Sequence, residues 1–263
     1  MTPPPLHSRL VLGMRVDATT YEDAAERILD WTCRKESRCV YCATVSQVME
    51  GHDTPRIQAI MNEADLVTPD GMPLVWGLRV LGFKSATRVY GPDLTPIILE
   101  MASINSIPVG IYGASSVALE RFVRAMTERF TKLNVVYAYS PPYRSLTPAE
   151  DKRVIEDIGR SGARILFVGI GNPRQEIWMA EHRAKIQAVM LGIGAAIDFL
   201  GGSKPQAPRW MMGLGLEWLY RLATEPRRLW KRYLTQNPRF MVLFALQLLG
   251  IKLRQAAIIK TAG

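Results

Sequence analysis

Apolar residues in the first 200 positions of the chain follow two spacings. Short runs that are almost wholly apolar are typical of buried strands, and they lie at residues 39–45, 64–67, 107–112, 133–140, 164–170 and 188–193. Between them, apolar residues recur every three or four positions, as in amphipathic helices, at about 20–32, 54–61, 71–81, 92–104, 116–130, 147–159 and 173–186. A strand or hairpin at residues 9–17 opens the chain. This alternation predicts an α/β fold: a Rossmann-like, mostly parallel sheet with helices on both faces.

The pattern changes after Gly201-Gly202. No strand is predicted from Lys204 onward, where the spacing favours two or three helices rich in Trp, Arg and Leu. We therefore divide the chain into an α/β catalytic body, residues 1–203, and a basic helical C-terminal appendage, residues 204–263. The appendage has eleven Lys or Arg and two acidic residues, so it accounts for the whole net charge of +9. A neutral body with a basic appendage indicates an anionic partner.

Aromatic and apolar residues interleave with the arginines of the appendage, which suits either a membrane surface or a solvated helical cap. Residues 240–251 are nearly all apolar, but they are too few to cross a bilayer, which takes about 20 residues. They fit an interfacial helix whose flanking cations are attracted to anionic lipid. No nucleic-acid-binding motif is present, so we expect a membrane surface and no nucleic acid as the partner. Arg221, Arg228 and Arg232 are candidate ligands for a diphosphate, which arginine clusters bind well.

Asp70 stands where a buried strand ends at Pro69 and a helical pattern begins. The carboxyl ends of parallel strands form the edge at which open α/β sheets bind ligands. The aspartate is therefore either the N-cap of that helix or a base that takes a proton from an attacking sugar hydroxyl. Gly71 beside it lets a ligand approach the backbone closely.

Two further strands carry candidate nucleotide-binding residues. The turn at 113–116 presents Gly113 and Ser115 at a helix N-terminus, where backbone N–H groups suit a phosphate. Tyr137 on the following strand is a candidate for stacking on a base. That strand ends without the acidic residue that dinucleotide sites use to hold a ribose, which argues against NAD, and we expect no cofactor.

Polar residues also follow the last two predicted strands. Asn172, Gln175 and Glu176 start one helix, and Asp198 comes after the final strand. Their amide and carboxyl groups either complement a helix N-terminus or bind sugar hydroxyls. No Asp-x-Asp pair is present to hold Mg²⁺ beside a diphosphate, and the three cysteines and three histidines lack the spacing of a zinc site. We therefore expect no metal, with phosphate held by backbone amides and arginines.

Five motifs follow one another between about residues 11 and 240: Val67-Thr68-Pro69-Asp70-Gly71, Arg88-Val89-Tyr90-Gly91-Pro92-Asp93-Leu94, Gly171-Asn172-Pro173-Arg174-Gln175-Glu176, Ala207-Pro208, and Leu216-Glu217-Trp218-Leu219-Tyr220-Arg221-Leu222 with Glu225-Pro226-Arg227-Arg228. In this order they resemble the WecG/TagA/CpsF glycosyltransferases, glycosyltransferase family 26. The resemblance implies transfer of a sugar from a UDP-sugar to a polyprenyl-diphosphate-linked saccharide in cell-surface polysaccharide synthesis. It further implies inversion at the anomeric carbon, no metal, and work at the cytoplasmic face of the membrane.

The resemblance also assigns roles to single residues. Asp70 is implied as the general base, and Arg88 and Asp93 are implied to bind substrate. Thr44 aligns with the asparagine of a Thr-x-Asn motif in the family, and Cys42 aligns with its threonine. Thr44 is therefore a candidate catalytic residue at a strand end where this chain departs from the family pattern, which makes a different sugar or acceptor plausible.

Two other classes of function stay open from the sequence. One is a nucleotide-sugar oxidoreductase, which the missing ribose acid opposes, and the other is a non-catalytic membrane- or nucleic-acid-binding module. The sequence also leaves open which sugar and acceptor are used, and whether the chain forms a homo-oligomer.

Overall fold

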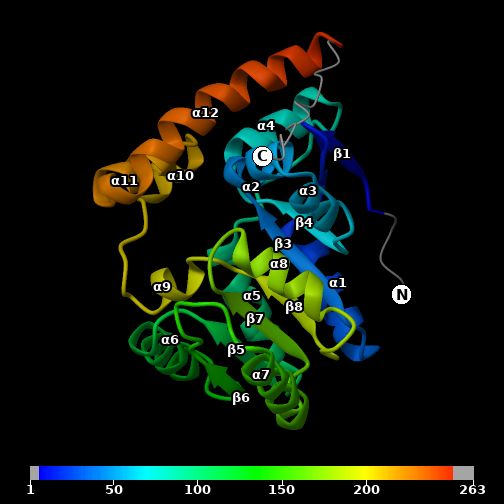
Figure 1. Ribbon diagram of the computed structural model, residues 1–263, viewed down its shortest axis with the longest axis vertical. Helices are drawn as coiled ribbons and strands as arrows, with labels where there is room; N and C mark the ends of the chain where they lie inside the picture. The colour runs from blue at the N-terminus through cyan, green and yellow to red at the C-terminus, as the bar shows by residue number, and fades with distance from the viewer. Residues whose placement is uncertain (1–5, 251–263) are drawn as a thin grey trace, which may run out of the picture.

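The computed structural model describes residues 6–250 and has a parallel six-stranded sheet at its centre (Figure 1). The strand order is β4-β3-β8-β7-β5-β6. The sheet strands are β3 (Arg38–Ala43), β4 (Leu66–Pro69), β5 (Val109–Gly113), β6 (Val135–Tyr139), β7 (Ile165–Gly169) and β8 (Val189–Gly192). A separate antiparallel hairpin, β1 (Ser8–Val11) and β2 (Met14–Asp17), precedes them. The predicted parallel sheet is therefore confirmed.

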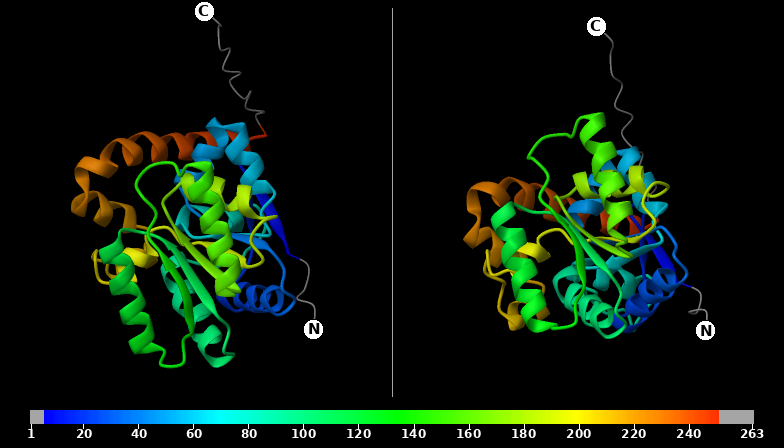
Figure 2. Two further views of the ribbon diagram at one scale, coloured as in Figure 1. Left: turned by 60° about the horizontal axis from the view of Figure 1, so that its bottom comes forward. Right: turned by 90° about the horizontal axis from the view of Figure 1, so that it is seen from below.

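Helices cover both faces of the sheet (Figure 2). One face carries α2 (Val45–Asp53), α3 (Pro55–Asn62), α4 (Met72–Val80), α7 (Pro148–Ser161) and α8 (Arg174–His182). The other carries α1 (Tyr21–Cys33), α5 (Gly91–Ile104), α6 (Ser116–Arg129) and α9 (Ala196–Leu200). Strand side chains alternate between the faces, so Cys39 packs in one core and Cys42 in the other. Because both faces are buried, the strands are continuously apolar in sequence.

Helix α2 follows β3 directly, although the apolar pattern predicts the next helix only from about residue 54. At its start, the side-chain oxygen of Gln47 accepts a hydrogen bond from the backbone N–H of Thr44 at 2.8 Å. The sequence signal for this helix is the Thr44-x-x-Gln47 spacing of a capping box. The short helix α9 is likewise absent from the prediction, because five residues are too few to show a helical period.

The C-terminal residues form α10 (Arg209–Gly213), α11 (Glu217–Thr224) and the long α12 (Pro226–Leu248). Figure 1 shows α12 extending along one end of the molecule past α2 and α4. Its Phe240 and Phe244 side chains are buried in the core that α2 and α4 share. Arg239 forms an ion pair with Asp53 at 2.5 Å, and the Gln247 side chain accepts the Leu12 N–H at 2.8 Å.

One face of α12 thus packs on the body while the opposite face stays open. Exposed apolar residues recur there at helical spacing, namely Trp230, Leu234, Met241, Val242, Leu248 and Leu249. Residue 251, the last of the predicted interfacial stretch, lies outside the described residues. No helix between residues 6 and 250 is long and apolar enough to span a membrane. The division at residue 203 stays a prediction, and the packing of α12 means that separating the two parts would uncover the core of the body.

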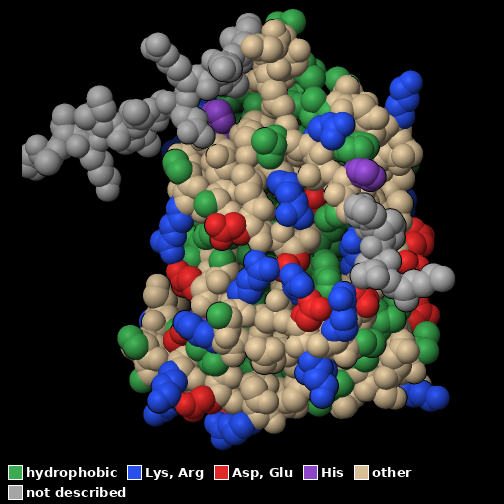
Figure 3. Space-filling view, turned by 90° about the vertical axis from the view of Figure 1, so that its right-hand side faces the viewer, with side chains coloured by type: hydrophobic (Ala, Val, Ile, Leu, Met, Phe, Trp, Pro, Cys, Tyr) green, Lys and Arg blue, Asp and Glu red, His purple; other side chains and the backbone are tan. Residues whose placement is uncertain are grey.

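The surface of the body carries both signs of charge. On the face that Figure 3 shows, Lys and Arg side chains are interspersed with Asp and Glu. This mixture agrees with the balance of acidic and basic residues that the sequence gives for positions 1–203.

Candidate active site

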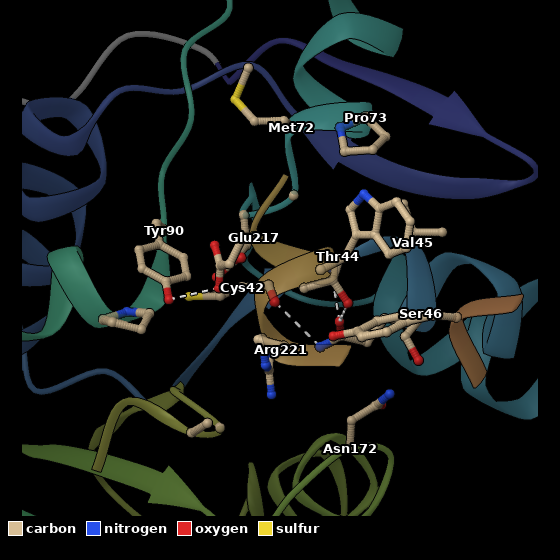
Figure 4. A pocket seen from close by; sticks show the side chains of 18 of the residues that line it. Cys42, Thr44, Val45, Ser46, Met72, Pro73, Tyr90, Asn172, Glu217 and Arg221 are labelled. Carbon is tan, nitrogen blue, oxygen red and sulfur yellow. Dashed lines mark hydrogen bonds between the residues drawn. The ribbon is translucent and has the colours of Figure 1, made fainter. Parts of the chain in front are cut away.

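A cavity of about 270 Å³ lies between the carboxyl ends of four strands and the C-terminal helices. Its inner wall comes from the segments that follow β3, β4, β7 and β8, and its outer wall comes from α10, α11 and α12. Figure 4 shows that side chains from both walls, including Thr44, Asn172, Glu217 and Arg221, surround the same space. Eight of the predicted site residues line it: Thr44, Asp70, Arg88, Asn172, Gln175, Arg221, Arg228 and Arg232.

Asp70 lies at the inner end of this cavity and is 8% exposed. Its Oδ2 accepts the backbone N–H of Gly91 at 2.8 Å. Gly71, not Asp70, is the N-cap of α4, and no side chain caps that helix, so the capping interpretation fails. Burial raises the pKa of Asp70 to about 7, although the nearby Arg88 guanidinium opposes the rise. A carboxyl group with this pKa is divided between its acid and base forms at neutral pH, which suits a general base.

Arg88 connects Asp70 with the C-terminal helices. Its Nε donates to the backbone carbonyl of Asp70, and its Nη2 lies 3.7 Å from Asp70 Oδ1. The same Nη2 donates to Glu217 Oε2 on α11 at 2.6 Å. The Tyr90 hydroxyl donates to the other oxygen of Glu217 at 2.9 Å, and the Arg88 guanidinium lies over the Tyr90 ring. Glu217 was not among the predicted site residues, and its signal in the sequence is only its place in the last of the five motifs.

Thr44 lines the cavity but turns its hydroxyl into the wall. The hydroxyl donates to Gln47 Oε1 at 2.6 Å, and the Gln47 amide in turn donates to Glu176 Oε1 at 3.0 Å. Neighbouring Cys42 also lines the cavity, and burial raises the pKa of its thiol to about 12. The thiol is therefore neutral beside Asp70 at physiological pH.

Glu176 does not reach the cavity, in contrast to the prediction that it binds a sugar hydroxyl. It is fully buried beneath Gln175, whose Nε2 donates to Glu176 Oε1 at 2.9 Å. Burial raises the pKa of Glu176 and favours its protonated form. Gln175 itself lines the cavity and accepts the Gly194 N–H at 3.2 Å. Through these hydrogen bonds, Glu176 and Gln47 position Gln175 and Thr44 in the cavity wall.

Several polar atoms of the cavity wall lack a partner. Among residues 6–250, the buried side-chain atoms without a hydrogen bond include Asn172 Oδ1, Arg221 Nε, Arg232 Nε and Gln236 Oε1, and all four residues line this cavity. Burying such groups unpaired is costly, so these atoms are available to pair with a molecule that enters the cavity. Gln236 follows Arg232 by one helical turn of α12, a relation that sequence reasoning missed. Arg228 lines the cavity too, but its Nε already pairs with Glu225 at 2.7 Å.

The predicted phosphate turn and stacking residue lie away from this cavity. Gly113 packs against the end of β7, where an added Cβ would lie 2.4 Å from the Gly169 carbonyl oxygen. The Ser115 hydroxyl caps α6 by accepting the Ala118 N–H at 3.3 Å. Tyr137 lies on the edge strand β6, where its ring lies near that of Tyr139 and packs against the core. These contacts give the three residues structural roles, and nucleotide binding at them stays a prediction.

The two remaining acidic candidates are held in ion pairs. Asp93 binds the Arg209 guanidinium through both oxygens, at 2.7 and 2.9 Å, and so attaches α10 to α5. Asp198 pairs with Lys204 at 3.4 Å. Neither lines the cavity. In the described part of the chain, no group of three or more His, Cys, Asp or Glu side chains is arranged to hold a metal ion.

The chain is similar to known proteins over most of its length. Residues 9–254 match the model of the glycosyl transferase WecG/TagA/CpsF family. The N-acetylglucosaminyldiphosphoundecaprenol N-acetyl-beta-D-mannosaminyltransferase of Bacillus spizizenii is 31% identical over 188 residues, which cover 71% of this chain and 70% of that protein. The protein of the same name from Staphylococcus aureus is 28% identical over 241 residues, covering 89% of this chain and 91% of that protein. The chain therefore belongs to the WecG/TagA/CpsF glycosyltransferase family.

Proposed function

We propose that the chain transfers a sugar from a UDP-sugar to a hydroxyl of a saccharide linked through diphosphate to a polyprenyl lipid. The relatives carry names that specify such an acceptor, N-acetylglucosamine on diphosphoundecaprenol, and an N-acetylmannosaminyl donor group. The observation that carries the proposal is one cavity in which a buried carboxyl faces unpaired guanidinium N–H groups. The carboxyl supplies a base, and the guanidinium groups supply an anion site.

Asp70 acts as the base in this proposal. The acceptor oxygen attacks the anomeric carbon from the side opposite the leaving group, so the configuration inverts. The bond from that carbon to the nucleotide breaks, and UDP leaves with the electron pair. The hydroxyl proton passes to the Asp70 carboxylate. The pKa of about 7 supports the role, because at neutral pH an appreciable fraction of the carboxyl is free to take the proton.

Arg221 and Arg232 hold phosphate oxygens in this proposal. Both have a buried Nε–H without a partner, and charged hydrogen bonds to phosphate would satisfy them. Arg228, which is more exposed, adds charge at the mouth of the cavity. The unpaired oxygens of Asn172 and Gln236 would accept hydrogen bonds from sugar O–H or N–H groups.

The reaction proceeds without a metal ion in this proposal. The acidic side chains that line the cavity are Asp70 and Glu217. Both oxygens of Glu217 are already bound, by Arg88 and Tyr90, and Asp70 is needed as the base. Arginine charges therefore take over the stabilisation of the leaving diphosphate that Mg²⁺ gives in other enzymes.

The exposed apolar face of α12 attaches the enzyme to the membrane in this proposal. The face extends over several helical turns from Trp230 to Leu249, and Arg227 and Lys231 lie on it. An apolar helix face flanked by cations binds at the interface of an anionic bilayer. The opposite face of the same helix bears Arg232 and Gln236, so the membrane and the cavity lie on two sides of one helix. A lipid-linked acceptor would then reach the cavity without leaving the bilayer.

The test is transfer by the full chain. A panel of radiolabelled UDP-sugars is offered together with N-acetylglucosamine linked by diphosphate to a short, water-soluble prenol. We expect a labelled disaccharide lipid with one donor, and its loss in Asp70→Asn. Asp157→Asn, at an exposed position of α7, is the matched control and should keep full activity. Absence of transfer with every donor, together with tight NAD(H) binding in a titration, would instead support an oxidoreductase.

A further inference from the structure

One guanidinium serves two carboxylates at the inner end of the cavity. Arg88 Nη2 lies 2.6 Å from Glu217 Oε2 and 3.7 Å from Asp70 Oδ1. All three side chains are largely buried, with 16%, 14% and 11% of the side-chain surface exposed for Arg88, Glu217 and Asp70. Electrostatic interactions are stronger at such a site than in water, so the division of this one charge matters.

Hydrogen bonds hold the Arg88 guanidinium closer to the Glu217 carboxylate than to the Asp70 carboxyl. The Arg88 Nε donates to the backbone carbonyl of Asp70, which holds the guanidinium plane in place. On the far side, Tyr90 donates its hydroxyl hydrogen to Glu217 Oε1 at 2.9 Å and so holds the carboxylate against Arg88. Asp70 receives no close side-chain donor in return. Its short hydrogen bond is the one from the Gly91 backbone N–H.

We propose that Glu217 is a positioning residue, which binds Arg88 and thereby keeps Asp70 a strong enough base to take the acceptor proton. Without the Glu217 charge, the guanidinium would pair with Asp70 alone and stabilise its ionised form. The carboxylate would then ionise at lower pH and hold a proton less well. This inference rests on the proposed role of Asp70, and it adds a residue 147 positions away, on α11, that no pattern around Asp70 identifies.

The other groups that face Asp70 do not replace Glu217. Cys42 on β3 and Tyr90 before α5 are neutral at physiological pH, because burial raises the pKa of both. Arg221 on α11 is a cation and lowers the pKa of Asp70, whereas the Glu217 charge raises it. Helix α11 thus brings one charge of each sign to the base. Glu217 is the acidic group among these neighbours.

The inference also links the base to the outer wall of the cavity. Glu217 belongs to α11, whereas Asp70 and Arg88 belong to the sheet edge. The strength of the base therefore depends on the seating of α11 against Arg88 and Tyr90. An open cavity would have a more acidic Asp70 than a closed one.

The test is the pH dependence of transfer by the full chain carrying Glu217→Gln. The amide keeps the size of the side chain and can still accept from Tyr90, but it has no charge. We expect the acidic limb of the profile of kcat/KM against pH to move to lower pH by about one unit. Arg88 would then pair with Asp70 alone and lower the pKa of that carboxyl. We also expect kcat at pH 8.5 to drop several-fold, since a weaker base accepts the proton less readily. Glu100→Gln, at an exposed site on α5, should leave the profile unchanged.

A second substitution and a second readout separate the possible causes. In an Arg88→Met background, Glu217→Gln should move the acidic limb of the kcat/KM profile much less, because Glu217 acts on Asp70 through its interaction with Arg88. Carbon-13 NMR of the Asp70 carboxyl should show the same downward shift in Glu217→Gln even if turnover is lost. An unchanged Asp70 titration in the folded variant would overturn the inference, and the proposed function would survive it if Asp70→Asn is inactive. Full activity of Asp70→Asn would overturn the proposed function itself.

Discussion

Replacement of Asp70 by asparagine should greatly reduce turnover and, above neutral pH, make the protein more stable. The carboxyl is buried and its pKa is raised from 3.8 to about 7. In the unfolded chain the group ionises near its ordinary pKa of about 4. Between these values the folded state binds the proton more tightly than the unfolded state, so stability falls as the pH rises from about 4 to about 7. Asparagine is neutral at every pH and removes this loss.

The size of the effect follows from the two pKa values. They differ by about three pKa units, and each is worth about 1.4 kcal/mol, so the ionised carboxyl costs the folded state up to about 4 kcal/mol above pH 7. We expect Asp70→Asn to recover roughly 2–4 kcal/mol at pH 8 and close to nothing at pH 4. For a chain of this size, that corresponds to a Tm increase of roughly 5–10 °C at pH 8. Turnover should fall by about 10²–10⁴-fold, the usual contribution of a general base.

The assay pairs thermal unfolding of both proteins at several pH values with sugar transfer at the same values. A gain in Tm that grows from pH 4 to pH 8, together with lost turnover, is the expected result. Equal Tm differences at all pH values would show that burial does not raise the pKa of Asp70. Near-normal turnover with an unchanged pH profile would show that the group takes no proton from the acceptor.

Three further predictions concern the cavity and helix α12. Transfer should be unaffected by EDTA, because the carboxylates of the cavity are already engaged; a rate that collapses with chelator and returns with Mg²⁺ or Mn²⁺ would contradict this. Phe240→Ala should cost about 3–5 kcal/mol in urea unfolding, as the ring is 1% exposed, whereas Met241→Ala beside it, at 61% exposed, should cost under about 0.5 kcal/mol. Arg232→Ala should raise the KM for the short, water-soluble diphosphate-linked acceptor by about 10-fold or more, since charged hydrogen bonds contribute about 1.5–3 kcal/mol; Arg227→Ala, on the exposed face of the same helix, should not change the KM for this membrane-free acceptor, and equal effects would argue for general charge attraction.

The C-terminal helices show a limit of sequence reasoning. The apolar stretch that starts at Phe240 fits lipid or protein equally well, because burial of apolar side chains is favourable in either environment. The structure uses both sides of α12, with Phe240 and Phe244 in the core and Met241 and Val242 exposed. Only the docking against α2 and α4 decides which residues belong to which face.

Glu176 was a predicted site residue and lies outside the cavity, whereas Glu217 was not predicted and lines it. Both differences have a similar reason. Glu176 follows a strand end within a recognisable motif, yet the first turn of α8 directs it into the core, where Gln47 and Gln175 bind it. Glu217 lies 129 positions from Arg88 and meets it only because the chain returns over the sheet edge. Local spacing cannot report contacts made over such separations.

The sequence alone determined the α/β class, the order of the strands and of the longer helices except α2, and the sheet edge at which Asp70 lies. These features depend on local periodicity and on the rule that parallel strands present their carboxyl ends together. Tertiary structure decided which of the polar strand ends share a cavity, as Thr44 and Gln175 do and as Gly113 and Ser115 do not. It also decided the pKa of Asp70, since burial and neighbouring charges are properties of packed surfaces brought together from distant parts of the chain.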